Sequence, residues 1–446
     1  MDAAEAKNYY LTRFSDLERA LTNNGRSWTG EIRQTAMARF AALGFPTTGE
    51  EEWRYTSLAP ITKVSFSPGC LEADDATREW IRSLALGSLE EHQLAFINGH
   101  FSAELSRLGR LPNGVIVGSL AAAMNDSKAK VEPYWARYAD YNSHGLVALN
   151  TALMEDGAFL LVPQGAVVEA PIHLMFVATA PDGATVSHPR SLIVIGDRSQ
   201  ATVVESYMGF DGAVYFTNAV TEIVVGEGAV LDHTKIELES ERAFHVATHE
   251  THIDRGGNLS SHSIALGGAL ARNDSNATLD GEGGECTLNG IYVAMGQQQV
   301  DNHTRIDHLK PHCSSRELYK GVMGGRSRAV FSGKIYVHKA AEKSDARQTN
   351  KNLLLSEDAW IDTKPQLEIY NNDVKCSHGS TIGQVDQDAL FYLRSRGIES
   401  SAAVALLTRG FVSEITGRIK SVPAREWLEK ILAPKLDLIS ADQSKL

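Results

Sequence analysis

The sequence predicts a mainly β protein built around a parallel β-helix, a solenoid in which short strands stack coil upon coil. Three observations predict this fold. Helical periodicity disappears for more than 200 residues after Glu155. Within that stretch, short apolar strands alternate with corners rich in Gly, Asp and Glu at a spacing of about 30 residues. Two-residue turns typical of hairpins are rare there, which favours coils over a β-sandwich, the competing architecture.

The repeat is visible at its corners, which we count from Asp197, Glu227, Gly256, Gly283, Arg326 and Asp358. Successive corners are about 30 residues apart, except that the step from Gly283 to Arg326 is clearly longer. We interpret the long step as a polar insertion at 297–316, which carries Asp301, His303, His308 and His312. A single coil cannot bury its own apolar face, so neighbouring coils must stack into one continuous core.

Residues 1–155 are expected to form an N-terminal helical and mixed region. Apolar residues recur at helical spacing from Leu11 to Leu21, and a second helix begins near Ile32 and ends near Gly44. The other expected elements are strands at 93–98 and 115–117 and a helix over 146–154.

Residues 156–384 make up the predicted β-helix, and residues 385–446 a C-terminal helical domain. An apolar stripe at three- and four-residue intervals runs through Val404, Leu407, Phe411, Ile415 and Ile419. Pro423 suits the first turn of a further helix, which contains Trp427. These helices are expected to seal one end of the solenoid, to dock another protein, or to do both.

Composition and motifs exclude several classes of function. A net charge of -12 argues against nucleic-acid binding. The chain lacks a Walker A motif and a GxGxxG strand-to-helix turn, so it is not expected to bind a nucleotide. Neither a secretory signal nor an apolar run of about 18 residues is visible, which predicts a cytoplasmic protein without a membrane span. Four scattered cysteines form no Cys-x-x-Cys and therefore no local zinc or cluster site: Cys70, Cys286, Cys313 and Cys376.

The segment Cys376-Ser377-His378-Gly379 is the strongest candidate site. Side chains two apart on a strand share a face, so Cys376 and His378 can offer two ligands to a metal if a partner supplies the rest. The alternative is a cysteine that packs as a small hydrophobe beside a hydrogen-bonded histidine. A Cys/His nucleophile pair is disfavoured, because parallel side chains on one strand are poorly placed for a thiol-to-imidazole hydrogen bond.

Histidines also gather in the middle of the chain: His233, His245, His249, His252 and His262. His249 and His252 cannot share a face of a strand, whereas His245 and His249 share one if their strand is regular. We expect most of these side chains to be hydrogen-bonded or exposed rather than metal ligands.

The run at 345–398, DARQTNKNLLLSEDAWIDTKPQLEIYNNDVKCSHGSTIGQVDQDALFYLRSRGI, resembles the SufB/SufD family of iron–sulfur cluster assembly proteins. The segments FSGKI at 331–335 and EEEWRYTSL at 50–58 support the resemblance. It is strongest over 301–411 and colinear elsewhere. The KCSHG motif with its FYLRSRGI tail is similar to the SufD branch, whereas SufB-like chains carry Glu after the motif cysteine.

The resemblance implies a right-handed parallel β-helix in a non-catalytic scaffold subunit. It implies pairing with a SufB-like paralogue through the β-helix, with a transient iron–sulfur cluster assembled at their interface by His378, beside Cys376. It further implies that a SufC-like ATPase docks on the C-terminal helices, for which we select Leu407, Phe411, Ile415 and Trp427. Nucleotide chemistry then belongs to the ATPase, which accounts for the missing Walker A motif.

Two alternatives remain open at this point. One is a SufB-like subunit that receives sulfur directly, for which Cys286 and Cys313 are the only thiols inside the β-helix. The other is a β-helix carbohydrate-active enzyme, a polysaccharide lyase or an esterase. The sequence also leaves open whether the isolated chain forms a homodimer, which cluster is assembled and whether a flavin takes part.

Overall fold

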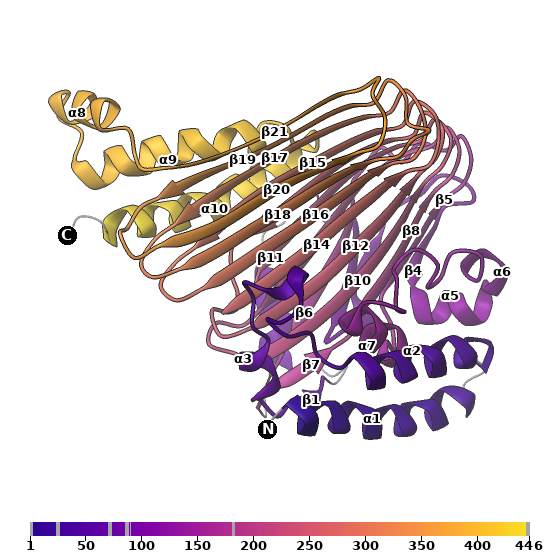
Figure 1. Cartoon of the computed structure of the whole chain (residues 1–446). Helices are drawn as coiled ribbons and strands as arrows, with labels where there is room; N and C mark the ends of the chain where they lie inside the picture. The colour runs from indigo at the N-terminus through magenta and orange to yellow at the C-terminus, as the bar shows by residue number, and fades with distance from the viewer. Residues whose placement is uncertain are drawn as a thin grey trace.

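The computed structural model describes residues 3–23, 27–69, 74–84, 89, 91–180 and 183–442. Its body is a solenoid of two long sheets whose strands run parallel from coil to coil (Figure 1). The first sheet contains β1 (Ser67–Pro68), β4 (Ile116–Ser119), β5 (Ala158–Val162), β7 (Thr185–Ser187), β8 (Arg190–Ile195), β10 (Tyr215–Val225), β12 (Phe244–Ile253), β14 (Leu270–Leu279), β16 (Gln299–His308), β18 (Arg328–Val337) and β20 (Trp360–Ile369).

The second sheet is linked to the first by the corners of each coil. It contains β2 (His92–Ile97), β3 (His100–Leu108), β6 (Ile172–Ala178), β9 (Gln200–Gly209), β11 (Val230–Leu238), β13 (Asn258–Ala265), β15 (Glu285–Ala294), β17 (Ser314–Met323), β19 (Asp345–Leu354) and β21 (Lys375–Gly383). Two antiparallel pairs, β2 with β3 and β4 with β5, stand at the N-terminal end. The mainly β solenoid predicted from the repeat is therefore confirmed.

The repeat is more regular than the sequence suggested. From β9 to β21, the odd-numbered strands begin at evenly spaced positions: Gln200, Val230, Asn258, Glu285, Ser314, Asp345 and Lys375. The predicted polar insertion at 297–316 is wrong, because this segment forms the whole of β16 and the start of β17. Gly283 precedes β15 of the second sheet, whereas Arg326 precedes β18 of the first sheet. The long step was therefore counted between two different kinds of corner, which do not occupy the same position in the repeat.

The interior of the solenoid is packed by alternate side chains from both sheets. Its apolar part is a continuous cluster that extends from Leu160 through Ala247 to Ile361. Tight corners keep the coils in register, and Gly228, Gly256 and Gly283 turn there with φ values of 62°, 63° and 71°. A side chain is strained in this left-handed region, which explains the glycines that mark the repeat.

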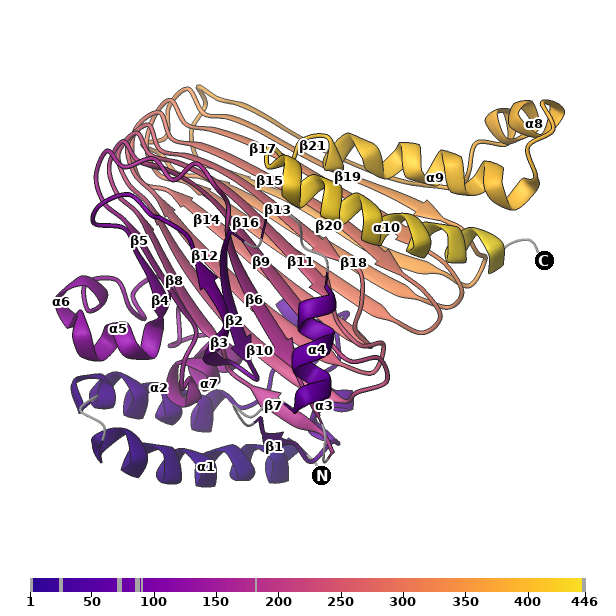
Figure 2. The same cartoon turned by 180° about the vertical axis from the view of Figure 1, so that it is seen from behind.

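Helices pack on part of the outer face of each sheet (Figures 1 and 2). In the N-terminal region they are α1 (Ala3–Asn23), α2 (Gly30–Leu43), α3 (Ala59–Thr62), α4 (Asp75–Ser83), α5 (Leu120–Asp126), α6 (Lys128–Val131) and α7 (Gly145–Leu153), with short 3-10 turns at Ser27–Thr29 and Glu51–Trp53. Helices α1, α2 and α7 share an apolar cluster with Phe216, Phe244 and Leu270 of the first sheet.

The C-terminal helices lie against the second sheet. They are α8 (Gln387–Ser395), α9 (Ser400–Thr416) and α10 (Val422–Asp442), and Gly397 ends the α8 segment with φ of 84°. Figure 2 shows α9 and α10 side by side across the face formed by β13, β15 and β17. Val412 and Leu428 pack there in one cluster with Leu318.

The helices and strands expected in the N-terminal region are confirmed, with α1, α2, α7, β2 and β4 close to their predicted limits. From β5 onward the strands follow one another from Ala158 to Gly383, near the expected divisions after residues 155 and 384, and the earlier strands β1–β4 add to the same two sheets. The division into domains itself stays a prediction. Among the described residues, no helix is both long enough and apolar enough to cross a membrane.

Candidate functional site

Strand β21 carries the predicted site on the last coil of the solenoid. It is the end strand of its sheet and pairs in parallel with β19, so that Cys376 is opposite Ala346 and His378 is opposite Gln348. Its partner in the last coil, β20, is likewise the end strand of the other sheet. We call the coil formed by β20 and β21 the rim; Figure 1 draws it in orange.

Cys376 and His378 point to the same face of β21 but differ in environment. Cys376 is half-buried against a small apolar cluster that includes Ile335, Val337 and Ala346. Burial raises the pKa of its thiol, which keeps it protonated at neutral pH. His378 is exposed. The imidazole is thus accessible at the rim, whereas the thiol packs partly as a small hydrophobe.

A buried polar line continues from His378 into the solenoid. The residue below His378 is Gln348, and the residue below Gln348 is Glu317 of β17. Gln348 donates a hydrogen bond from Nε2 to Glu317 Oε2 at 2.8 Å, and the Thr304 hydroxyl also donates to Glu317. Burial raises the pKa of Glu317 to about 7. A carboxyl group that titrates near neutral pH therefore lies two coils beneath the exposed histidine.

The rim holds too few ligands for a metal ion by itself. Within the described residues, the only three groups of ligand type that converge are Glu205, His233 and His249, far from the rim in the coil order. Cys286 lies on the same inward row as Cys376, but Ser315 and Ala346 separate them. Adjacent strands are about 4.8 Å apart, so the two thiols are about 14 Å apart. Cys70 lies outside the described residues.

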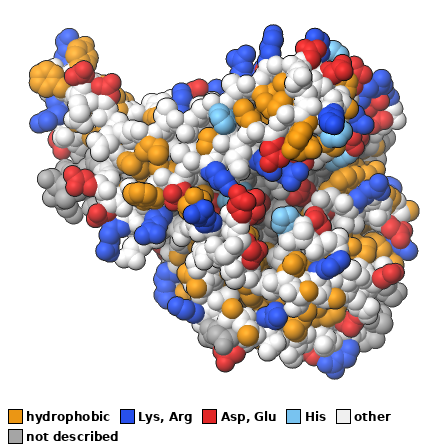
Figure 3. Space-filling view, in the orientation of Figure 1, with side chains coloured by type: hydrophobic (Ala, Val, Ile, Leu, Met, Phe, Trp, Pro, Cys, Tyr) orange, Lys and Arg blue, Asp and Glu red, His pale blue; other side chains and the backbone are white. Residues whose placement is uncertain are grey.

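The rim also exposes apolar side chains. Trp360, Ile369, Tyr370 and Ile382 are 62%, 40%, 53% and 49% exposed. In Figure 3, hydrophobic side chains are visible over the upper part of the molecule, where Figure 1 places the last strands. An end strand also leaves backbone donors and acceptors unpaired along its free side. The last coil thus combines an exposed histidine with an apolar, hydrogen-bonding edge.

The four residues selected for ATPase docking fall into two groups. Ile415 and Trp427 are buried in the cluster that holds α9 and α10 to the second sheet. Leu407 and Phe411 are partly exposed and pack on the edge of the same cluster. Lys320 of β17 donates a hydrogen bond to the backbone carbonyl of Phe411 at 2.6 Å. These contacts attach the helices to the solenoid, and the docking role of the four side chains stays a prediction.

Helix α8 differs from α9 and α10 in its exposure to solvent. None of its side chains is buried, and Phe391 and Tyr392 are 74% and 58% exposed. Figure 3 shows hydrophobic and charged side chains together on the projection at upper left, where Figure 1 places α8. The docking role predicted for the C-terminal helical domain at 385–446 includes this helix, but none of its residues was selected, although the adjacent aromatic pair is visible in FYLRSRGI.

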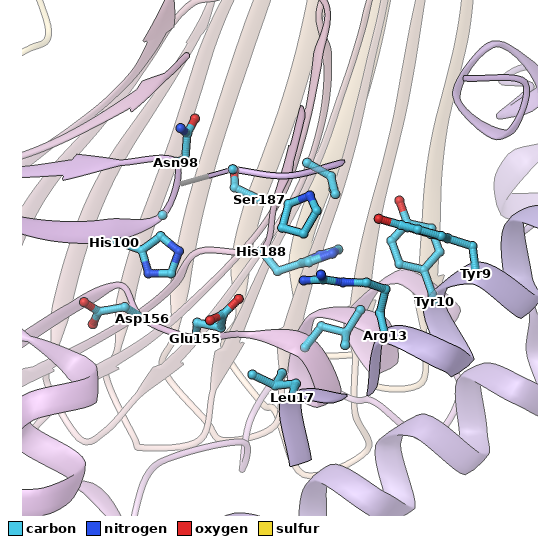
Figure 4. Close-up of a pocket in the computed structure, with 15 residues that line it drawn as sticks. Tyr9, Tyr10, Arg13, Leu17, Asn98, His100, Glu155, Asp156, Ser187 and His188 are labelled. Carbon is cyan, nitrogen blue, oxygen red and sulfur yellow. The ribbon is translucent and has the colours of Figure 1, made fainter. Parts of the chain in front are cut away.

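A pocket near the N-terminus brings α1 close to the start of the solenoid (Figure 4). Arg13 and Tyr10 of α1 face His188, whose ring is 5.9 Å from that of Tyr10. Burial and, to a smaller extent, Arg13 lower the pKa of His188 to about 3, so this imidazole is neutral. The pocket offers no group of three metal-ligating side chains among the described residues, and it lies at the opposite end from the rim.

Two protein-family models together match most of the chain. Residues 176–411 match the family described as SUF system FeS cluster assembly, SufBD core domain, and residues 4–174 match the SufBD protein N-terminal region. The chain belongs to the SufB/SufD family.

Among its relatives, the chain is 33% identical over 400 residues to an iron–sulfur cluster assembly SufBD family protein of Synechocystis, covering 87% of this chain and 86% of the relative. It is 31% identical over 389 residues to the iron–sulfur cluster assembly protein SufD of Escherichia coli, covering 87% and 88%. It is 27% identical over 444 residues to SufD of Bacillus subtilis, covering 96% and 97%. The chain is therefore a SufD-like member of the SUF system.

Proposed function

We propose that this chain is a non-catalytic scaffold subunit for iron–sulfur cluster assembly, and that it pairs with a SufB-like paralogue through the rim. The observation that carries this proposal is the open last coil, where each sheet ends in a strand whose outer edge is unpaired among the described residues and which exposes apolar side chains. An extended strand edge of this kind is suited to the addition of strands from another chain. When the chain is isolated, the same edge would accept a second copy.

Within this complex, we assign His378 to the cluster-assembly site, with Cys376 as a secondary ligand. His378 is exposed on the edge that the partner would cover, and this chain offers too few ligands nearby to hold a cluster alone. Imidazole and thiolate both suit iron, so a SufB-like partner that adds ligands would complete the site. The cluster is then the transient product of the complex, released to recipient proteins.

The proposal places nucleotide hydrolysis in a SufC-like ATPase that docks on the C-terminal helices, in the cytoplasm. Helices α9 and α10 are attached to the sheet below the rim strands, so a movement of the ATPase would reach the site through rigid elements. Membership of the SufB/SufD family favours this role over a carbohydrate-active enzyme. A SufB-like sulfur acceptor is disfavoured, because Cys286 and Cys313 are buried and burial raises the pKa of both thiols.

Pairing through the rim can be tested by Ile382→Asp. This side chain is 49% exposed in the chain alone, so the substitution should leave folding intact but bury a charge at the proposed interface. After co-expression with a SufB-like paralogue and the ATPase, the variant should lose the paralogue on affinity purification. The matched control is Leu108→Asp, since Leu108 is 44% exposed on β3 at the other end of the same sheet. Retention of the paralogue by the Ile382 variant would contradict the proposal.

A further inference from the structure

The interior of the solenoid contains a second cluster of ligand-type side chains, which we call the interior triad. It consists of Glu205 on β9, His233 on β11 and His249 on β12, and all three are buried. One ligand atom from each lies within 4.8 Å of the others. The triad joins two neighbouring coils and both sheets, in a space that apolar side chains fill elsewhere in this core.

The distances within the interior triad are close to those of a metal site. His233 Nε2 is 3.3 Å from Glu205 Oε1, and His249 Nε2 is 3.7 Å from Glu205 Oε2. Zinc–nitrogen and zinc–oxygen bonds of about 2.0–2.2 Å place ligand atoms about 3.3 Å apart in a tetrahedral site. These two distances end on different oxygens of Glu205, and the three ligand atoms lie within 4.8 Å of one another, so the side chains would have to draw closer together to share one ion.

His249 supplies an independent observation. Its Nε2 is buried but has no hydrogen-bond partner among the described residues, although it faces the Glu205 carboxylate. A buried nitrogen of this kind costs free energy unless something pairs with it. A metal ion at the centre of the triad would pair with it.

The groups around the triad favour ligation. The Ser261 hydroxyl is 3.0 Å from His233 Nδ1, a contact that fixes the imidazole with Nε2 towards Glu205. Tyr207 donates to Glu205 Oε2 at 2.9 Å and orients the carboxylate. Lys235 donates to Glu237 and to Asn273, and its Nζ lies 5.2 Å from the centre of the Tyr207 ring, so a cation borders the triad but is paired with the Glu237 carboxylate.

We propose that Glu205, His233 and His249 bind one divalent transition-metal ion of borderline hardness, Zn²⁺ or Fe²⁺, inside the solenoid. Two nitrogens and one carboxylate are a ligand set that suits these ions and leaves a position open for water. The ion would link both sheets across the coils of β9–β12 and would therefore stabilise the folded chain. The inference is independent of the role proposed for His378.

The test uses the full chain with Cys376→Ala and His378→Ala, which removes the rim as a competing site. After chelator treatment, this protein is titrated with Zn²⁺ against a chromogenic chelator, with Fe²⁺ under anaerobic conditions, and with Co²⁺ as a spectroscopic probe. We expect one ion per chain, visible Co²⁺ bands of a tetrahedral site without the near-ultraviolet absorption of thiolate ligation, and a higher melting temperature with metal. A protein that binds no stoichiometric ion would overturn the proposal.

Substitutions at the triad show which side chains bind the ion. Adding His249→Gln or Glu205→Gln should weaken binding by about 100-fold or more, and Ser261→Ala by about 10- to 100-fold. The matched control is His308→Gln, which replaces a buried histidine bonded to Ser315 outside the triad and should bind as before. His249 Nε2 makes no hydrogen bond, so His249→Gln is the variant that should fold most normally, as checked by circular dichroism without metal. Equal affinity in this variant and the control would refute the site.

Discussion

At the residue scale, a fully buried ion pair joins two strands of the first sheet away from the rim. Arg190 Nη2 of β8 is 2.7 Å from Glu222 Oε2 of β10, and neither side chain is exposed. Glu222 also accepts hydrogen bonds from the backbone N–H groups of Ala136, Tyr138 and Ala139. One carboxylate therefore fixes an N-terminal loop to the outer face of the solenoid and neutralises a buried guanidinium.

Glu222→Gln should lower the free energy of unfolding by about 3–5 kcal/mol, because it leaves the Arg190 charge buried without a counter-ion. Urea denaturation measures this loss. Asp437→Asn is the control: it breaks the pair between Arg409 and Asp437, whose side chains are 46% and 51% exposed, and should cost less than about 1 kcal/mol. A similar small cost for both variants would mean that burial of the Glu222 pair adds nothing.

The element scale shows what the sequence could and could not predict. Each coil needs turn residues at recurring positions, so the period of the repeat was visible and the solenoid followed from it. The positions of strands and corners within each repeat were not visible, which is why β16 was mistaken for an insertion. The alternation of side chains along a strand was enough to place Cys376 and His378 on one face, whichever strands pair with theirs. Gln348 and Glu317 were missed, because their positions beneath His378 depend on a register between strands that are a full coil apart in the sequence.

The interior triad was missed for the same reason. Its residues come from three strands, and the local spacing of His233 and His249 contains no sign of Glu205. Writing the coils one beneath another would have aligned His233 with Ser261, its hydrogen-bond partner, and this is the signal that could have drawn attention to it.

The 3-10 turn Glu51–Trp53 is an element that fastens the N-terminal region to the solenoid. Trp53 lies 3.7 Å beneath the guanidinium of Arg272, and Arg272 donates to the Glu52 carbonyl at 2.8 Å. His303 of β16 is 3.3 Å from Glu52 and 3.1 Å from Asp301. Burial alone would lower the pKa of His303, but the Asp301 carboxylate and its other partners raise it to about 9.

This arrangement predicts a pH dependence of stability. The folded-state pKa of His303 is above its ordinary value of 6.5, so its stabilising contribution is complete below about pH 6.5 and is lost as the pH rises through about 9. We expect a loss on the order of 2 kcal/mol over this range, measured by urea denaturation. His303→Gln should flatten the dependence, whereas His144→Gln, at an exposed histidine, should not. An unchanged slope in the His303 variant would show that another group titrates.

Helix α8 has no buried side chain and exposes an aromatic pair, which makes it a candidate contact for a further subunit. Phe391→Asp with Tyr392→Ser should remove a SufC-like ATPase from the purified complex without lowering the melting temperature, because both side chains are exposed. Val167→Asp, at a 49% exposed position between β5 and β6, provides the control and should keep the ATPase. If the α8 variant also keeps the ATPase, the exposed aromatic pair of α8 is not needed for docking.

At the scale of the whole molecule, the two ends of the solenoid differ. Antiparallel strands and the helices α1–α7 occupy the N-terminal end (Figure 1). The other end is the rim, where parallel strands stop without a cap of their own and where the second sheet already carries α9 and α10. A partner that continues the sheets at the rim would cover His378 and the apolar edge, close to the sheet on which α9 and α10 pack. This is the basis of the shared-site proposal.

The most direct test of this proposal is the iron and acid-labile sulfide content of the complex carrying His378→Ala. The complex is co-expressed with a SufB-like paralogue and a SufC-like ATPase and isolated anaerobically. We predict that all subunits co-purify while iron and sulfide fall to background. Ser380→Ala, the next residue on the same face of β21, should keep both. An intact His378→Ala complex that retains the iron and sulfide of the unmodified complex would contradict the assignment of His378 to the assembly site.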